Sequence, residues 1–294
     1  MLKKSKLILL LSCQLCLRAS YFIILPILPF VIRDAGLTEE FTGYVFGAFG
    51  IGPMLGSLVA GKAMSYFSRK CMLLTCFIGF ALLYLPVGTV ELIEDKNRVG
   101  YTLLAARLVQ GFFAGAAFTT TVAMLLVDAE DDEERQNLNI LRLVVDILGL
   151  LFGPIIGALI YSVTTSFLHQ ALASFAVAAL LCLAIGFMDD NQVQETASTN
   201  RLDHITYCRL LKIPRVVLGA IGGTFVLIFT LQYFESVMSY IFEKEHQLDK
   251  IQIGYIFCLI PVGVFAAIYP SMLLAKHMTK RFVLMMTMLF IVFV

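Results

Sequence analysis

The chain has 294 residues, of which 59% are hydrophobic and 15% are charged, whereas charged residues make up about a quarter of a soluble domain. Its 22 basic and 21 acidic residues leave a net charge of +1, so the chain has no basic excess for binding nucleic acid. The seven cysteines and four histidines form neither a disulfide framework nor a metal-site spacing. We therefore expect an all-α membrane protein with no metal ion, no cofactor and no nucleic acid partner.

Hydrophobic runs predict the transmembrane helices, because a helix needs about 20 apolar residues to cross the hydrocarbon core. Eight runs are long enough, at residues 7–32, 41–63, 71–91, 100–127, 140–163, 168–188, 214–242 and 251–275, and a ninth at 282–294 is shorter. The sequence thus predicts eight full transmembrane helices and a partial ninth. Because the ninth run stops within a helix, we expect the chain to be truncated at its C-terminus.

The basic residues predict the orientation, since lysine and arginine near helix ends stay on the cytoplasmic side. With the N-terminus inside, 15 of the 22 basic residues fall on cytoplasmic flanks and five on the other side. We predict an integral, multi-pass protein with a cytoplasmic N-terminus; the plasma membrane and a vesicular membrane remain open alternatives. The lysines before the first run also suit a cleaved signal peptide, but the run continues to Ile32, too far for one.

A polar stretch divides the predicted helices into two groups. It covers residues 189–212 and is rich in Asn, Gln, Thr and Ser without apolar periodicity, as in a linker. We predict a six-helix bundle at residues 1–188, a cytoplasmic linker at 189–212 and an incomplete second bundle, helices 7–9, at 213–294.

The two groups resemble each other in sequence. Gly-Tyr-Val-Phe at residues 43–46 recurs as Gly-Tyr-Ile-Phe at 254–257, an offset of 211, and residues 25–29 lie opposite 235–239 at an offset of 210. We interpret helices 1–3 and 7–9 as a pseudo-repeat, as found in transporters built from two six-helix halves with the substrate between them.

Three short motifs carry a family resemblance. They are Arg107-x-x-Gln110-Gly111 in the fourth run, Gly149-x-x-x-Gly153-Pro154-x-x-Gly157 in the fifth run, and Gly61 with the basic pair Arg69-Lys70 in the loop between the second and third runs. With these motifs the chain resembles the major facilitator superfamily, and within it the drug–proton antiporter and vesicular amine (polyamine) transporter branch. In the loop, Ser65 stands where the family has an aspartate.

The resemblance implies a monomeric bundle of 12 helices in the lipid bilayer, of which the last three and part of a fourth are missing. It implies exchange of protons for a small organic solute, an amine or a drug-like compound. The loop residues Ser65, Arg69 and Lys70 would then act in gating. Arg107 would lie in the central cavity, coupled to proton movement, and Glu235 would match a glutamate of the vesicular carriers.

Charged residues inside the membrane are the candidate path for solute and protons, because a charge there is costly unless it has a partner or faces a cavity. The candidates are Arg18, Arg107, Asp146 and Glu235, with the polar neighbours Gln110 and Gln232. Three alternatives stay open: Arg107 as an arginine that snorkels to the outer surface, Glu235 as an interfacial acid, and Asp146 as the partner of Arg142, four residues earlier.

Arg18 bears on the nature of the substrate. It is expected near the membrane midplane, where a cation conflicts with a simple amine site. It suits an anionic or zwitterionic solute, or a salt bridge to Glu235 or Asp146 that substrate or proton must open.

We predict a secondary active transporter, with proton-coupled antiport of an amine or drug-like solute as the leading interpretation. The alternatives are a carrier of an anionic or zwitterionic solute and a non-transporting, truncated relic or receptor-like membrane protein. No catalytic constellation is present in the sequence, so we do not expect an enzyme.

Glycines spaced four apart predict close helix packing. The sets are Gly43/Gly47, Gly52/Gly56, Gly111/Gly115 and Gly149/Gly153/Gly157. Prolines at 26, 29, 53 and 261 are expected to bend the first, second and eighth helices.

Overall fold

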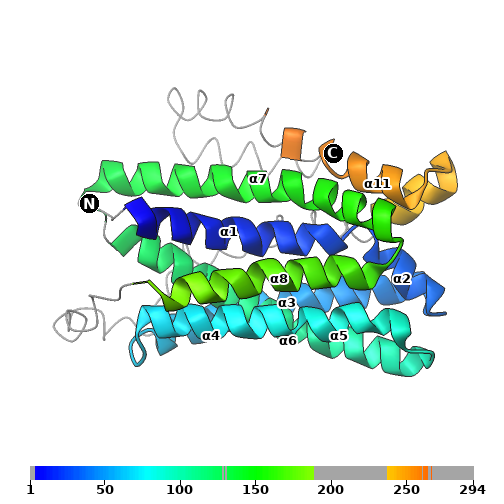
Figure 1. Ribbon diagram of the computed structural model, residues 1–294, viewed down its shortest axis with the longest axis horizontal. Coiled ribbons are helices and arrows are strands. Elements are labelled where there is room, and N and C mark those ends of the chain that lie inside the picture. The colour runs from blue at the N-terminus through cyan, green and yellow to red at the C-terminus, as the bar shows by residue number, and fades with distance from the viewer. Residues whose placement is uncertain are drawn as a thin grey trace, which may run out of the picture.

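The computed structural model describes residues 4–127, 129, 131–188, 237–259, 261–263 and 266. The regular elements in these ranges are helices (Figure 1). They are α1 (Lys4–Ile24), α2 (Leu28–Asp34), α3 (Glu39–Ala63), α4 (Arg69–Leu82), α5 (Tyr84–Thr89), the 3-10 helix η1 (Val90–Leu92), α6 (Lys96–Val127), α7 (Asp132–Thr164), α8 (Phe167–Gly186) and α11 (Lys250–Ile256). Residues 237–246 are also helical.

Six helical stretches in the described residues are long and apolar enough to cross a membrane. They are Lys4–Asp34, Glu39–Ala63, Arg69–Leu92, Lys96–Val127, Asp132–Thr164 and Phe167–Gly186. They confirm the first six predicted runs. The seventh and eighth runs are described only in part, through residues 237–246 and the apolar helix Lys250–Gly263. The predicted linker and ninth run lie outside the described residues, so the total helix count stays a prediction.

Two features of the helices depart most from the sequence prediction. The fifth long helix begins at Asp132 rather than at residue 140, because Asp131 caps it by accepting a hydrogen bond from the Glu134 backbone at 2.6 Å. Acids in its first turn also suit the positive end of the helix dipole. The first span breaks at residues 25–27, between α1 and α2, where Pro26 and Pro29 cannot continue a regular helix.

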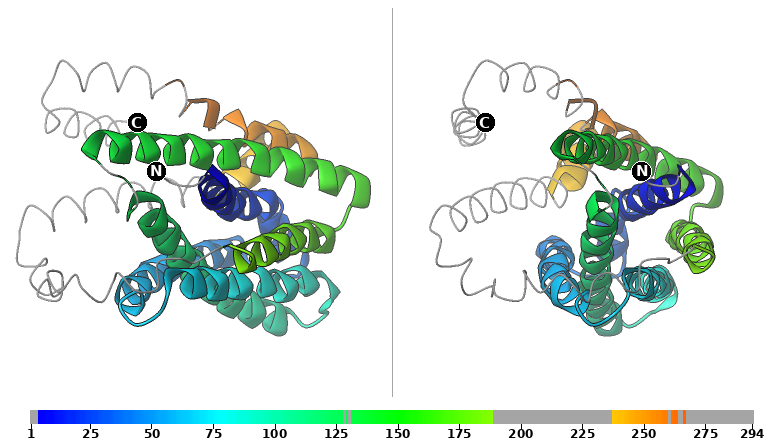
Figure 2. Two further views of the ribbon diagram at one scale, coloured as in Figure 1. Left: turned by 60° about the vertical axis from the view of Figure 1, so that its left-hand side comes forward. Right: turned by 90° about the vertical axis from the view of Figure 1, so that its left-hand side faces the viewer.

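Helix α1 lies at the centre of the packing. In the most apolar stretch of the Lys4–Asp34 span, 78% is buried. The corresponding share is 28% in both Glu39–Ala63 and Phe167–Gly186. Its main partner is α7, and α3 packs in the same way against α6 (Figure 2). The glycines of the fifth predicted run make the first contact possible. A Cβ at Gly149 would lie 2.6 Å from the Arg18 Cβ, and one at Gly153 would lie 2.5 Å from the Phe22 Cβ.

Glycines also allow α3 and α6 to pack closely against each other. A Cβ at Gly52 would lie 2.6 Å from the Phe112 backbone nitrogen, and one at Gly111 would lie 2.5 Å from the Phe49 carbonyl oxygen. At Gly43 and Gly47, by contrast, no described atom lies within 4 Å of an added Cβ. The expected packing role of that pair is therefore not found in the described part of the chain.

Gly52→Ala should destabilise the protein, because backbone atoms of α6 block the added methyl group and cannot rotate away. We expect a loss of about 1–3 kcal/mol, as for other overpacked interiors, seen as a lower apparent unfolding temperature in detergent. Gly47→Ala on the same helix is the matched control and should be neutral or slightly stabilising. Equal unfolding temperatures for the two variants would contradict the close α3–α6 contact.

Candidate functional site

The carboxylate of Asp146 on α7 is the centre of a charged cluster. Its Oδ1 accepts a hydrogen bond from Gln14 Nε2 at 2.7 Å and one from Arg18 Nε at 3.4 Å. Its Oδ2 accepts one from Arg142 Nη1 at 3.3 Å. The exposed fraction of the side chain is 43% for Arg18, 15% for Arg142 and 11% for Asp146. One carboxylate therefore holds two guanidinium groups, and Arg18 remains accessible.

The helix geometry explains how these side chains meet. Gln14 and Arg18 are one turn apart on α1, and Arg142 and Asp146 are one turn apart on α7, so each pair shares a face. Gly149, almost one turn beyond Asp146, lets the α1 backbone come close. Arg18 and Asp146 each lie 14 residues after the first residue of their helices, or about 21 Å along the axis. The cluster thus lies near the middle of the bundle.

An aromatic ring from a third helix completes the site. The Cζ atoms of Arg18 and Arg142 lie 5.8 Å and 5.3 Å from the centroid of the Phe118 ring on α6. Both distances are within the range of cation–π attraction. We call Gln14, Arg18, Phe118, Arg142 and Asp146 the Asp146 cluster.

The Asp146 cluster contains two of the pairings left open by the sequence, whereas the pairing of Arg18 with Glu235 lies outside the described residues. Asp146 pairs with Arg142, as its spacing on α7 suggested, and it also forms the salt bridge with Arg18. Neither Phe118 on α6 nor Gln14 on α1 was predicted as a site residue.

Arg107 is buried between helices rather than extended to a surface. Its exposed fraction is 1%, so the snorkelling alternative is wrong. Its Nη1 donates to Gln110 Oε1 at 3.0 Å. Its Cζ lies 5.6 Å from the Phe49 centroid and 5.9 Å from that of Tyr21, and these two rings stack at 4.4 Å. Gln232 and Glu235, the other candidates, lie outside the described residues.

The loop between α3 and α4 makes local contacts. Ser65 Oγ donates to the Lys62 carbonyl at 2.7 Å, and Lys70 Nζ donates to the carbonyl of Met188, just after α8, at 2.5 Å. Arg69 is the first residue of α4, which Ser68 caps. The loop therefore connects α3, α4 and the end of α8 at one end of the bundle.

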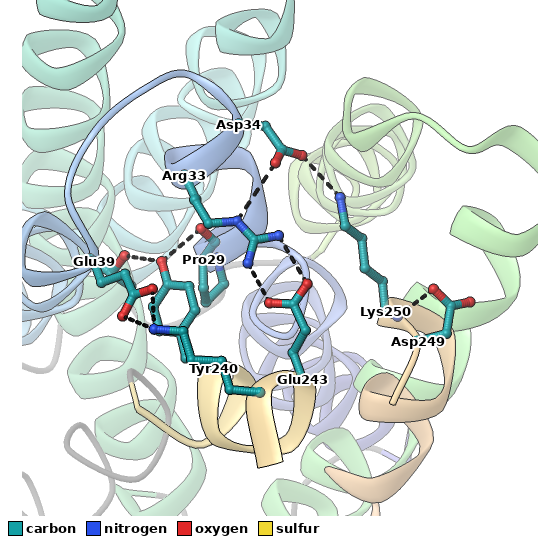
Figure 3. A network of polar contacts seen from close by, with 10 residues as sticks. Pro29, Arg33, Asp34, Glu39, Tyr240, Glu243, Asp249 and Lys250 are labelled. Atoms are coloured by element: carbon teal, nitrogen blue, oxygen red, sulfur yellow. Dashed lines mark hydrogen bonds and ion pairs between the residues drawn. The ribbon is translucent and has the colours of Figure 1, made fainter. Parts of the chain in front are cut away.

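At the opposite end, three ion pairs join the first helices to residues 243–250 (Figure 3). Arg33 donates two hydrogen bonds to Glu243, one from Nη1 to Oε2 and one from Nη2 to Oε1 at 2.9 Å. Lys250 Nζ lies 3.0 Å from Asp34 Oδ2. Lys244 Nζ lies 2.7 Å from Glu39 Oε1. We call these six residues the Arg33 belt; each of its pairs links segments about two hundred residues apart.

A buried tyrosine lies beside the belt. The Tyr240 hydroxyl donates to the Pro29 carbonyl at 2.9 Å and forms a second hydrogen bond of 2.8 Å with the Thr42 hydroxyl. The Tyr240 ring lies 6.2 Å from that of Phe30, centroid to centroid. Arg33, Lys244 and Lys250 are three of the five basic residues that the predicted orientation puts on the outer side, and their pairing with acids was not predicted.

Comparison with known proteins places this architecture in a family. The model of the major facilitator superfamily matches residues 10–294. The chain belongs to the major facilitator superfamily. Family membership and the six apolar helices make it an integral, multi-pass membrane protein and confirm the first part of the resemblance.

The individual proteins that resemble this chain share little sequence identity with it. The quinolone resistance protein NorA of Staphylococcus aureus is 23% identical over 262 residues, which cover 87% of this chain and 63% of NorA. The chain therefore spans less than two thirds of that relative. The crystal structure of a D-xylose–proton symporter has a TM-score of 0.68 at 16% identity, covering 93% of this chain and 69% of that one.

A bacterial homolog of the human lysosomal transporter Spinster, solved in an inward-facing and unoccupied conformation, has a TM-score of 0.67 at 15% identity. This similarity covers 96% of the chain and 64% of that structure. At these identities, the two structures support the fold alone.

Proposed function

We propose that the chain is part of a proton-coupled secondary transporter that moves a small organic solute between two helix bundles. The observation that carries this proposal is the Arg33 belt. Its pairs join α2 and α3 to residues 243–250 and so hold one end of the bundle together. Partly exposed ion pairs of this kind are worth little individually. Such weak pairs can break and re-form, so they would allow this end of the bundle to open and close, as alternating access requires.

One pair of the belt, and the hydrogen bond beside it, have the spacing of the proposed repeat. Arg33 and Glu243 are 210 residues apart, and Pro29 and Tyr240 are 211 apart. These are the offsets at which the two halves of the sequence resemble each other. Residues close to a two-fold axis meet their own equivalents, so an axis along the membrane normal would bring these positions together.

Two substrate classes fit the proposal. Antiport of an amine or drug-like compound rests on the resemblance to the drug–proton and vesicular branch and on Glu235 as the proton-exchanging carboxylate, with Arg107 as its modulator. An anionic or zwitterionic solute is favoured by the Asp146 cluster, where two arginines share one carboxylate.

Transport by the complete transporter that contains this chain, reconstituted in liposomes, tests the proposal. An imposed pH gradient should drive accumulation of labelled solutes from a panel of amines and carboxylates, and a protonophore should abolish it. Absence of gradient-driven accumulation for the whole panel would favour the alternative of a non-transporting membrane protein.

The orientation can be tested with single cysteines in a cysteine-free variant. We expect Asp95→Cys, between η1 and α6, to react with an impermeant thiol reagent in intact cells. Tyr66→Cys, between α3 and α4, should react only after permeabilisation. Both side chains lie in exposed loops, so the predicted difference reflects the side of the membrane. The reverse pattern would overturn the cytoplasmic N-terminus.

A further inference from the structure

We infer that the Asp146 cluster binds an anionic group of the solute, such as a carboxylate. This inference rests on the proposed transport function and names its substrate class. The site comprises the guanidinium groups of Arg18 and Arg142, the ring of Phe118 and the amide of Gln14.

The charge balance of the cluster is the first argument. Arg18 from α1 and Arg142 from α7 face the single carboxylate of Asp146, and α6 contributes the uncharged Phe118. In the described parts of α8 and α11, no charged side chain contacts these groups. Counted over the described residues, the cluster therefore has one positive charge in excess at mid-bundle depth, where an unbalanced charge is unfavourable. One bound anion would neutralise it.

The free donors of Arg18 are the second argument. Arg18 reaches Asp146 through Nε alone, at 3.4 Å, and among the described residues nothing accepts from its two Nη groups. A guanidinium offers five donors in a planar fork that matches a carboxylate in a bidentate geometry. Because 43% of the Arg18 side chain is exposed, these donors are accessible to a solute.

Gln14 supplies a third, independent argument. Its side chain is fully buried, and its Oε1 has no hydrogen-bond partner in the described part of the chain. Buried acceptors are normally satisfied. A hydroxyl or ammonium hydrogen close to the anionic group of a ligand would satisfy this one. The combination favours a carboxylate with a nearby donor, or a zwitterion, over a simple amine, which would add a third cation beside one carboxylate.

A single tryptophan makes binding measurable. The chain contains no tryptophan, so Phe118→Trp places one fluorescent reporter against both guanidinium groups. Three five-carbon probes differ in their end groups: glutarate has two carboxylates, 5-aminopentanoate has one carboxylate and one ammonium, and 1,5-diaminopentane has two ammonium groups. We expect glutarate and 5-aminopentanoate to change the fluorescence of the detergent-solubilised protein saturably, and 1,5-diaminopentane to leave it unchanged.

Variants in the Phe118→Trp background test the role of Arg18. Arg18→Gln should weaken glutarate binding about tenfold or more, since a charge-assisted pair is lost, and Arg18→Lys should keep part of the affinity. Arg135→Gln is the matched control: it removes an arginine from the same helix as Arg142, paired locally with Asp132 at 3.2 Å, and should not change binding. Retained Arg18→Lys binding shows that the site folds when Arg18 is replaced.

Three results would overturn the inference: tighter binding of the diamine than of glutarate, no saturable response to either carboxylate, or full glutarate affinity in Arg18→Gln. Binding in detergent does not depend on transport, so the two proposals fail separately. If glutarate binds but never accumulates, the transport proposal is wrong and the anion site stands. If the pH gradient drives accumulation of the diamine and no anion binds, the anion site is wrong and the transport proposal stands.

Discussion

Arg33→Glu should reduce net solute transport about tenfold or more, and addition of Glu243→Arg to the same protein should restore most of it. The single change removes a two-bond ion pair and places two carboxylates opposite each other. A shift of about 1.4 kcal/mol in the equilibrium between the open and closed forms changes their ratio tenfold. The double reversal recreates the pair with its polarity exchanged, so the end can close again. Initial rates of uptake into liposomes measure the effect.

Arg98→Glu is the control for this charge reversal. In the described part of the chain Arg98 pairs with the nearby Asp95 alone, at 3.6 Å, and 80% of its side chain is exposed. Its reversal should leave transport unchanged. Wild-type rates for Arg33→Glu, or a double reversal no better than the single one, would show that the Arg33 belt does not take part in transport.

Glu235→Gln should abolish proton-driven accumulation while leaving exchange of labelled for unlabelled solute across the membrane intact. Glutamine keeps the shape of the side chain but cannot take up a proton, and exchange without net movement needs no proton. The prediction rests on the family resemblance and on the cost of a carboxylate inside the membrane, since Glu235 lies outside the described residues. Accumulation and exchange are measured on the same liposomes.

Asp146→Asn is the matched comparison. Because Asp146 holds two arginines, we expect this variant to weaken solute exchange but to keep the response to a pH gradient. Unchanged accumulation by Glu235→Gln, together with its loss in Asp146→Asn, would assign the proton to Asp146 instead.

The positions of the first six helices could be predicted because long apolar runs have few alternatives in a membrane. The start of α7 at Asp132 could not, since its first turns are polar and depend on the Asp131 cap rather than on hydrophobicity. The break after Ile24 was visible as two prolines, although they fix only the place of a bend and not its form.

The candidate site was predictable only where it depends on one helix. The Arg142–Asp146 pair follows from helical spacing, and Arg18 was left with two possible partners. The second guanidinium and Phe118 depend on how α1, α6 and α7 pack. The belt joins residues about two hundred positions apart, and the repeat offset was the one signal in the sequence that could have matched Arg33 with Glu243.

The most direct test of alternating access is the distance across the Arg33 belt. Glu40 and Glu245 line the same groove between α3 and residues 237–246 and are exposed. Nitroxide labels on cysteines at these two positions, in a cysteine-free variant, report that distance by pulsed electron resonance. We expect two populations in liposomes, a short distance as in the described structure and a longer one, whose ratio changes with pH and with glutarate. A single short distance under all conditions would contradict the proposal that this end of the protein opens.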